Sequence, residues 1–189
     1  GCTVGDLLAR EGKLSESKAL LIAEAVASAL NYAWEKARII HCDVKPDNVL
    51  IATDGTVKIS DLGLARSLDR LAENPNKTLI WGTPNYVSPE QAQGVEDLDC
   101  RSDIYSLGAM LYHMVTGKLP FAGSPGSSAM DKHISDFLTD PYDLDSSLSA
   151  GVVWLIEKLM IKDRAARPAS WTSVGFDLAE VIQGYMPHA

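Results

Sequence analysis

The sequence has few cysteines, only 3 in 189 residues, and they are far apart with no C-x-x-C pair. Disulfide frameworks and zinc sites need clustered cysteines, so neither is expected, and reduced thiols in a cytoplasmic protein fit best. The sequence also lacks any apolar run near the roughly 18 residues that span a bilayer. Nothing at its N-terminus resembles a signal peptide. We therefore expect no membrane segment in this chain.

Basic residues are in deficit: 17 Lys and Arg against 25 Asp and Glu give a net charge of −8. A general nucleic-acid binder needs a basic face, so this class of function is excluded. The content of 46% hydrophobic and 22% charged residues is typical of globular proteins. The length suits a single domain, or one large lobe of a bigger catalytic domain.

Helical patterns dominate the chain. Residues 102–116 are apolar on nearly all sides, which predicts a helix at the centre of the domain. Gly117 and Pro120 are expected to end it. Ser15 and Ser170 are expected to cap two further helices. The full set of predicted helices is 4–10, 15–36, 102–116, 129–138, 150–160 and 171–183.

A β-hairpin is predicted between residues 49 and 59, because Asp54-Gly55 separates two short apolar runs. The two ends of a hairpin lie together. Asn48, just before it, and Asp61, just after it, should therefore be neighbours, with Asp43 and Lys45 in the preceding loop. This gathers two carboxylates, an amide and an ammonium in one place. The stretch that follows, residues 64–87, shows no regular spacing of apolar residues. Irregular segments of this length are usually functional.

Five motifs then occur in the order and spacing of the eukaryotic-type protein kinase family: HCDVKPDN, DLG, GTPNYVSPE, DCRSDIYSLG and the Arg167-Pro168 pair. The chain resembles the bacterial Ser/Thr kinases in particular. The resemblance implies that residues 1–189 are the C-terminal lobe of a kinase domain. It places the catalytic loop at 41–48 and the activation segment at 61–90.

The resemblance also implies roles for individual residues. Asp43 is expected to accept or orient the hydroxyl of a Ser or Thr in a protein substrate, and Lys45 to neutralise the phosphoryl group of ATP. Asn48 and Asp61 are expected to bind Mg²⁺, since their oxygens are the hard ligands that this ion prefers. Thr83, together with Lys45, is typical of Ser/Thr rather than Tyr kinases.

Structural roles follow for four more residues. His41 is expected to pack beneath the catalytic loop, and Asp103 to hold the backbone of that loop by hydrogen bonds. Glu90 and Arg167 are expected to form a buried ion pair at the end of the activation segment.

The chain departs from the family pattern in three ways. Cys42 replaces the arginine that normally contacts a phosphorylated activation segment, so a switch that does not need phosphate on Ser67 or Thr78 is expected. Leu62 replaces a phenylalanine and keeps an apolar side chain. Finally, no G-x-G-x-x-G occurs, nor the V-A-I-K lysine motif of the family's N-terminal lobe. We therefore expect an isolated lobe that is inactive alone and self-associates through the apolar surface an N-terminal lobe would cover.

Two other functions remain open. The first is a non-catalytic, kinase-like scaffold or protein-interaction module, against which the four residues Asp43, Lys45, Asn48 and Asp61 argue. The second is a metal-dependent phosphohydrolase. It would need more metal ligands, and His113, His133 and His188 are not spaced to supply them.

Overall fold

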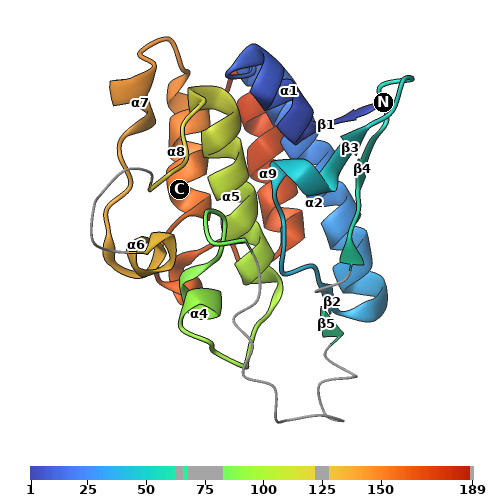
Figure 1. The fold of residues 1–189 in the computed structure, drawn as a ribbon, viewed down its shortest axis with the longest axis vertical. Helices are drawn as coiled ribbons and strands as arrows, with labels where there is room; N and C mark the ends of the chain where they lie inside the picture. The colour runs from blue at the N-terminus through green and yellow to red at the C-terminus, as the bar shows by residue number, and fades with distance from the viewer. Residues whose placement is uncertain (63–65, 68–82, 122–127, 188–189) are drawn as a thin grey trace.

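The structure is a computed structural model that describes residues 1–62, 66–67, 83–121 and 128–187. It is a helical bundle with a small β-hairpin at one edge, as the sequence predicts (Figure 1). The helices are α1 (Val4–Glu11), α2 (Glu16–Ala37), α4 (Pro89–Ala92), α5 (Cys100–Thr116), α6 (Ala129–Ser135), α7 (Pro141–Leu144), α8 (Ala150–Leu159) and α9 (Trp171–Ile182). The strands are β1 (Cys2–Thr3), β2 (Ile39–Ile40), β3 (Val49–Ile51), β4 (Val57–Ile59) and β5 (Arg66–Ser67). Two 3₁₀ turns, η1 (Pro46–Asn48) and η3 (Arg164–Ala166), complete the description.

Helix α5 is the central element, as its all-round apolar sequence predicts. It packs against α2 and α8, and nearly every one of its side chains is buried. Gly108 is required for this packing, because a Cβ atom there would lie 2.8 Å from side-chain atoms of Leu159 and Met160. Asp99 caps the start of the helix by accepting a hydrogen bond from the Arg101 amide, and Gly117 ends it with a φ of 69°.

Helix α2 covers one side of α5 and also packs on α9. Ser15 caps it as predicted, accepting a hydrogen bond from the Lys18 amide. One face of the helix is buried at Ile22, Val26 and Leu30, which follow one another at a spacing of four residues. Burial of this face holds α2 on the bundle, since a helix gains most of its stability in a protein from such packing.

The predicted hairpin is confirmed. Strands β3 and β4 are antiparallel with Leu50 opposite Lys58, and Gly55 takes the positive φ of 85° that the turn needs. Strand β1 adds to the other edge of β3. Strands β2 and β5 form a separate pair, with Ile39 opposite Ser67.

Some boundaries differ from the prediction. Helix α6 ends at Ser135 rather than at residue 138, and its C-cap residue Asp136 is extended. The sequence analysis also missed α4 and α7, two single-turn helices that begin with a capping Ser or Asp followed by proline. No helix in the described ranges is both long and apolar enough to cross a membrane.

Candidate active site

The hairpin brings the two predicted metal-binding residues to the same end of the sheet. The amide and the hydroxyl of Ser60 both donate to the carbonyl oxygen of Asn48, at 2.8 and 3.1 Å. Asp61 follows directly, with an exposed side chain and a left-handed φ of 63°. The turn in the backbone at Asp61 therefore comes immediately beside Asn48.

His41 connects the loop that precedes the hairpin with the loop that follows it. Its Nδ1 accepts a hydrogen bond from the Asp43 amide at 3.3 Å, so the ring proton is on Nε2. Nε2 donates to the carbonyl oxygen of Ser60 at 2.9 Å. His41 is fully buried. One side chain thus fixes the backbones of Asp43 and of the residue before Asp61.

Asp103, at the start of α5, holds the other side of the same loop. Its two carboxylate oxygens accept hydrogen bonds from the amides of His41 at 2.7 Å and Cys42 at 2.9 Å. Burial raises the pKa of Asp103 to about 6, and the two amide donors oppose this rise by favouring the carboxylate. These bonds hold Cys42 at a φ of 66°, a conformation that a residue with a Cβ atom rarely adopts.

The Asp43 carboxylate is the centre of a compact polar cluster. Oδ1 accepts a hydrogen bond from the Thr83 hydroxyl at 2.6 Å. Oδ2 accepts from the Asn48 amide nitrogen at 3.0 Å and lies 2.8 Å from the Lys45 ammonium. Lys45 also donates to the Thr83 hydroxyl at 2.7 Å. The structure therefore brings together Asp43, Lys45, Asn48 and Thr83, which belong to two segments of the sequence.

This cluster determines the charge on Asp43. Burial alone would raise the pKa of its carboxyl, but the hydrogen bonds from Lys45 and Thr83 outweigh burial and lower the pKa below its usual value. Asp43 is therefore an anion at neutral pH. A hydroxyl group that approached it would find a fixed acceptor.

The oxygen donors of Asn48 and Asp61, at this end of the hairpin, are of the kind that binds a magnesium ion. Asn48 turns its Nδ2 toward Asp43, also donating to the Asp43 carbonyl at 2.8 Å, so its Oδ1 is the atom that could bind a metal. Asp61 offers a carboxylate. Mg²⁺ is usually bound through one or two carboxylates plus water and phosphate, and this sparse set of oxygen donors meets that requirement. In the described part of the chain, no cluster of three or more His, Cys, Asp and Glu residues could hold a metal.

Glu90 and Arg167 form a buried, two-bonded ion pair. The guanidinium nitrogens lie 2.7 and 2.8 Å from the two carboxylate oxygens, and the Ser102 hydroxyl donates to Glu90 at 2.7 Å. Burial would raise the pKa of Glu90, but the bonds and the charge of Arg167 lower it overall. Ser102 and the bond from Arg167 to the carbonyl oxygen of Arg101 attach this pair, and with it α4, to the start of α5.

Sequence reasoning missed Gln91, which links α4 to the loop at residues 41–48. Its side chain is buried, donates to the carbonyl oxygen of Cys42 at 3.0 Å and accepts from the hydroxyl of Ser88 at 3.0 Å. The spacing of Ser88 and Gln91 is that of a capping box, a signal that predicts a helix start at Pro89. The bond from Gln91 to Cys42 has no such signal.

The predicted activation segment is only partly described. Thr78 lies outside the described residues, and Ser67 is described only as backbone in β5. Cys42 lies buried in a small apolar cluster with Ile40 and Leu98. Position 42, where the resemblance places an arginine, therefore carries a buried apolar contact.

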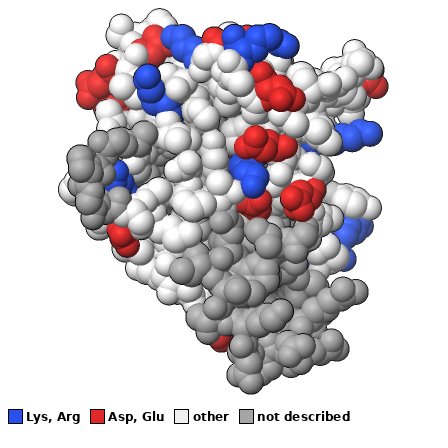
Figure 2. All heavy atoms as spheres, in the orientation of Figure 1, with Lys and Arg blue, Asp and Glu red and all other residues white. Residues whose placement is uncertain are grey.

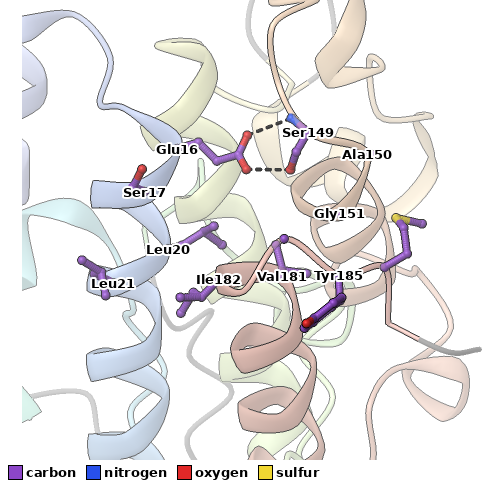
Figure 3. Close-up of a pocket in the computed structure, with 12 residues that line it drawn as sticks. Glu16, Ser17, Leu20, Leu21, Ser149, Ala150, Gly151, Val181, Ile182 and Tyr185 are labelled. Carbon is purple, nitrogen blue, oxygen red and sulfur yellow. Dashed lines mark hydrogen bonds between the residues drawn. The ribbon is translucent and has the colours of Figure 1, made fainter.

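A hollow of about 350 Å³ lies elsewhere, between the start of α2, the start of α8 and the end of α9 (Figure 3). Glu16 closes one side by accepting hydrogen bonds from the Ser149 amide at 2.8 Å and from its hydroxyl at 2.6 Å. None of the predicted site residues lines this hollow. The histidines considered for a phosphohydrolase also lie apart: His113 bonds Tyr86, His133 bonds Tyr105, and His188 is outside the described residues.

Comparison with known proteins shows which sequences the chain is similar to. Residues 2–178 match the protein kinase domain family. The chain is 36% identical over its whole length to the probable serine/threonine-protein kinase PknB of Bifidobacterium longum, and 34% identical to the serine/threonine-protein kinase PknB of Mycobacterium tuberculosis. It is 37% identical, over 96% of its length, to the probable serine/threonine-protein kinase CPE1738 of Clostridium perfringens. The chain spans only 27%, 30% and 26% of the lengths of these three relatives.

Proposed function

Because the chain belongs to the protein kinase domain family, we propose that it forms the lower half of a phosphoryl-transfer site in a longer Ser/Thr kinase. In this proposal the substrate is a Ser or Thr hydroxyl of a protein, and the donor is ATP with Mg²⁺. Residues 1–189 are the C-terminal lobe, with 41–48 as the catalytic loop and 61–90 as the activation segment. The observation that carries the proposal is the Asp43–Lys45–Thr83 cluster.

Each member of the cluster has a place in the proposed reaction. The substrate hydroxyl replaces one of the present donors to Asp43. Asp43 then orients the hydroxyl and accepts its proton as the hydroxyl oxygen bonds to the γ-phosphorus of ATP, while the bond from this phosphorus to the bridging oxygen breaks and ADP leaves. The Lys45 ammonium, already 2.8 Å from Asp43, offsets the negative charge on the transferred group. Thr83 holds both side chains at the spacing the reaction needs.

Asn48 and Asp61 are the proposed metal ligands. Bound Mg²⁺ neutralises phosphate charge and so makes transfer possible. The role of this chain in binding the metal is to present two oxygen donors at one end of the hairpin. The hydrogen bonds of Ser60 and His41 fix the spacing of these donors.

Exposed apolar residues lie near these ligands. Leu62, directly after Asp61, is 58% exposed, and Leu50 on β3 is also exposed. In this proposal an N-terminal lobe, supplied by another part of the protein, covers them and closes the site over ATP. A chain studied without that lobe is expected to self-associate through this surface.

The test compares the longer protein that contains this chain with its Asp43→Asn variant. The assay follows transfer of labelled γ-phosphate to Ser or Thr of a basic protein. The variant keeps the shape of the side chain but loses its charge, so the rate should fall at least about a hundredfold. Asp47→Asn, an exposed change in the same loop, is the matched control and should keep the activity.

The 189-residue chain tested alone should transfer no phosphate, since it lacks half of the proposed pocket. An unchanged rate in Asp43→Asn would contradict the assignment and favour a non-catalytic scaffold. Transfer by the isolated chain would show instead that its own residues suffice to hold ATP.

A further inference from the structure

A second surface, unrelated to the proposed active site, lies where the end of α6 and the residues that follow it meet the end of α8. These helices are on the side of the bundle opposite the hairpin (Figure 1). A hollow of about 310 Å³ opens here. Its apolar walls include Phe137, Leu138, Met160 and Ile161. Phe137, which directly follows Asp136 at the end of α6, is 97% exposed.

An aromatic side chain exposed to this extent has no role in the packing of the domain. Ordinary surface residues that are apolar cover part of their area against their neighbours, and Phe137 covers almost none. It stands beside a hollow that is itself mostly apolar. Exposed aromatic groups next to such hollows are typical anchors of protein interfaces, where burying them contributes most of the affinity.

The rim of the hollow is acidic. Asp136 and Glu157 line it, and the charge of Asp140 lies close enough to Glu157 to act on it. Burial, and then repulsion by Asp140, raise the pKa of Glu157. Acidic side chains are visible along the left edge of Figure 2, over α6 and α7. The rim therefore holds like charges near one another, at a cost that a bound cation would offset.

The basic side chains of this region are engaged elsewhere. Lys162 donates to the carbonyl oxygens of Lys132 and His133 and to the Tyr105 hydroxyl, at 3.2, 2.8 and 3.3 Å, which uses all three of its N–H groups. Lys132 donates to the carbonyl oxygen of Phe121 at 3.1 Å. Lys158 pairs with Asp177 at 2.8 Å. Lys162 also lines the hollow, and its charge interacts with Asp136. It offsets one of the three carboxylates Asp136, Asp140 and Glu157, so the rim keeps a net negative charge.

From the apolar hollow, the exposed Phe137 and the acidic rim, we infer that this surface docks a basic segment of a partner protein. That segment carries an apolar side chain for the hollow and Lys or Arg for Asp136, Asp140 and Glu157. A second copy of this chain fits poorly, because two acidic rims would meet and the net charge is −8. Nucleic acids and anionic lipid surfaces are repelled for the same reason.

The test measures binding of a short fluorescein-labelled peptide in which arginine alternates with leucine, by fluorescence anisotropy. The chain should bind this peptide, and added salt should weaken the binding. Two further probes separate the contributions: one has glutamate in place of arginine, the other serine in place of leucine. Both should bind at least about fivefold more weakly.

Two pairs of variants localise the binding. Phe137→Ala should weaken it at least about fivefold, whereas Phe176→Ala, at a 70% exposed phenylalanine on α9, should not. Glu157→Gln should weaken it, whereas Glu35→Gln on the exposed side of α2 should not. Because the altered side chains are exposed, all four variants should keep the unfolding transition of the parent chain.

Three outcomes would overturn the inference. One is equal binding of the arginine and glutamate peptides. Another is a Phe137→Ala variant that binds as well as the parent chain. The third is a concentration-dependent dimer in sedimentation that Phe137→Ala abolishes, which would make a second copy the occupant. Since no arm of the test involves phosphate transfer, its result does not depend on the proposed function.

Discussion

Two ion pairs of nearly equal length have opposite characters in this molecule. Arg167 and Glu90 lie 2.7 Å apart, and the Arg167 side chain is 0% exposed. Lys45 and Asp43 lie 2.8 Å apart, but the Lys45 side chain is 21% exposed. The first pair is closed to solvent and the second is open to it. The contrast separates groups that hold the fold from groups that can exchange partners.

The bonds around each cation give the physical reason. Arg167 uses all five of its N–H donors: three bonds go to the carbonyl oxygens of Ile161, Arg101 and Lys162, and two go to Glu90. Among the described residues, the Lys45 ammonium bonds two side chains, those of Asp43 and Thr83. A flexible lysine with side-chain partners can turn toward a substrate, whereas a fully bonded arginine cannot turn without breaking backbone contacts.

The largest effect on stability is expected from Arg167→Ala. This change leaves the Glu90 carboxylate buried without its partner, and breaking such a pair costs about 3–5 kcal/mol of unfolding free energy. Urea denaturation followed by circular dichroism measures the loss. The matched control is Arg164→Ala, whose ion pair with Asp97 is at the surface and should be worth at most about 1 kcal/mol. Equal losses in the two variants would remove the distinction between closed and open pairs.

An intermediate effect on stability is expected from lowering the pH, through His133. This residue is buried, like the Glu90–Arg167 pair that is closed to solvent. Tyr105 accepts a hydrogen bond from Lys162 and so points its own proton at Nδ1 of His133, 2.9 Å away, which keeps this ring neutral. Burial lowers the pKa of His133 from 6.5 to about 4. Between these values the unfolded chain binds more protons than the folded chain. Stability should therefore fall as the pH drops from about 6.5 to about 4, by at most about 3 kcal/mol.

Replacing the histidine tests this assignment. His133→Gln keeps an acceptor for Tyr105 but cannot titrate, so its stability should depend less on pH over the same interval. The readout is the midpoint of urea unfolding at a series of pH values. If both proteins lost stability with the same slope, the acid sensitivity would belong to other groups.

The smallest effect on stability is expected from Asp61→Asn, at the solvent-exposed end of the hairpin. The side chain is exposed, and asparagine tolerates the left-handed backbone at least as well as aspartate. The free energy of unfolding should change by no more than about 0.5 kcal/mol. The same change in the longer protein should abolish Mg²⁺-dependent transfer, because it removes the proposed metal carboxylate. A large loss of stability would show that the Asp61 side chain helps to hold the fold, as the Glu90–Arg167 pair does.

The sequence predicted the parts of the fold that depend on local signals. The hairpin follows from Asp54-Gly55, and the central helix follows from an apolar pattern on all sides, so Asn48 and Asp61 had to meet. The buried ion pair and its hydrogen bonds are harder to predict, because they join residues far apart in the chain. Glu90 and Arg167 could be paired only through the family resemblance.

Other features were out of reach for a related reason. The bond from Gln91 to Cys42 depends on where α4 lies relative to the loop at residues 41–48, which no local pattern specifies. The early end of α6 follows from the extended backbone at Asp136, although the helical pattern continues to residue 138. Single-turn helices such as α7 bury too little surface to leave a periodic signal.

The two left-handed residues beside the hairpin have an evolutionary consequence. Cys42 and Asp61 both carry a Cβ atom at positive φ, where each costs about 1–2 kcal/mol relative to the usual backbone. Glycine would relieve this strain at either position. At position 42 this gain is offset by the loss of the buried apolar contacts of the Cys42 side chain. Selection for stability alone should therefore favour glycine at the exposed position 61, whereas selection for metal binding should retain the carboxylate there. The identity found at position 61 in evolved variants would report which pressure had acted.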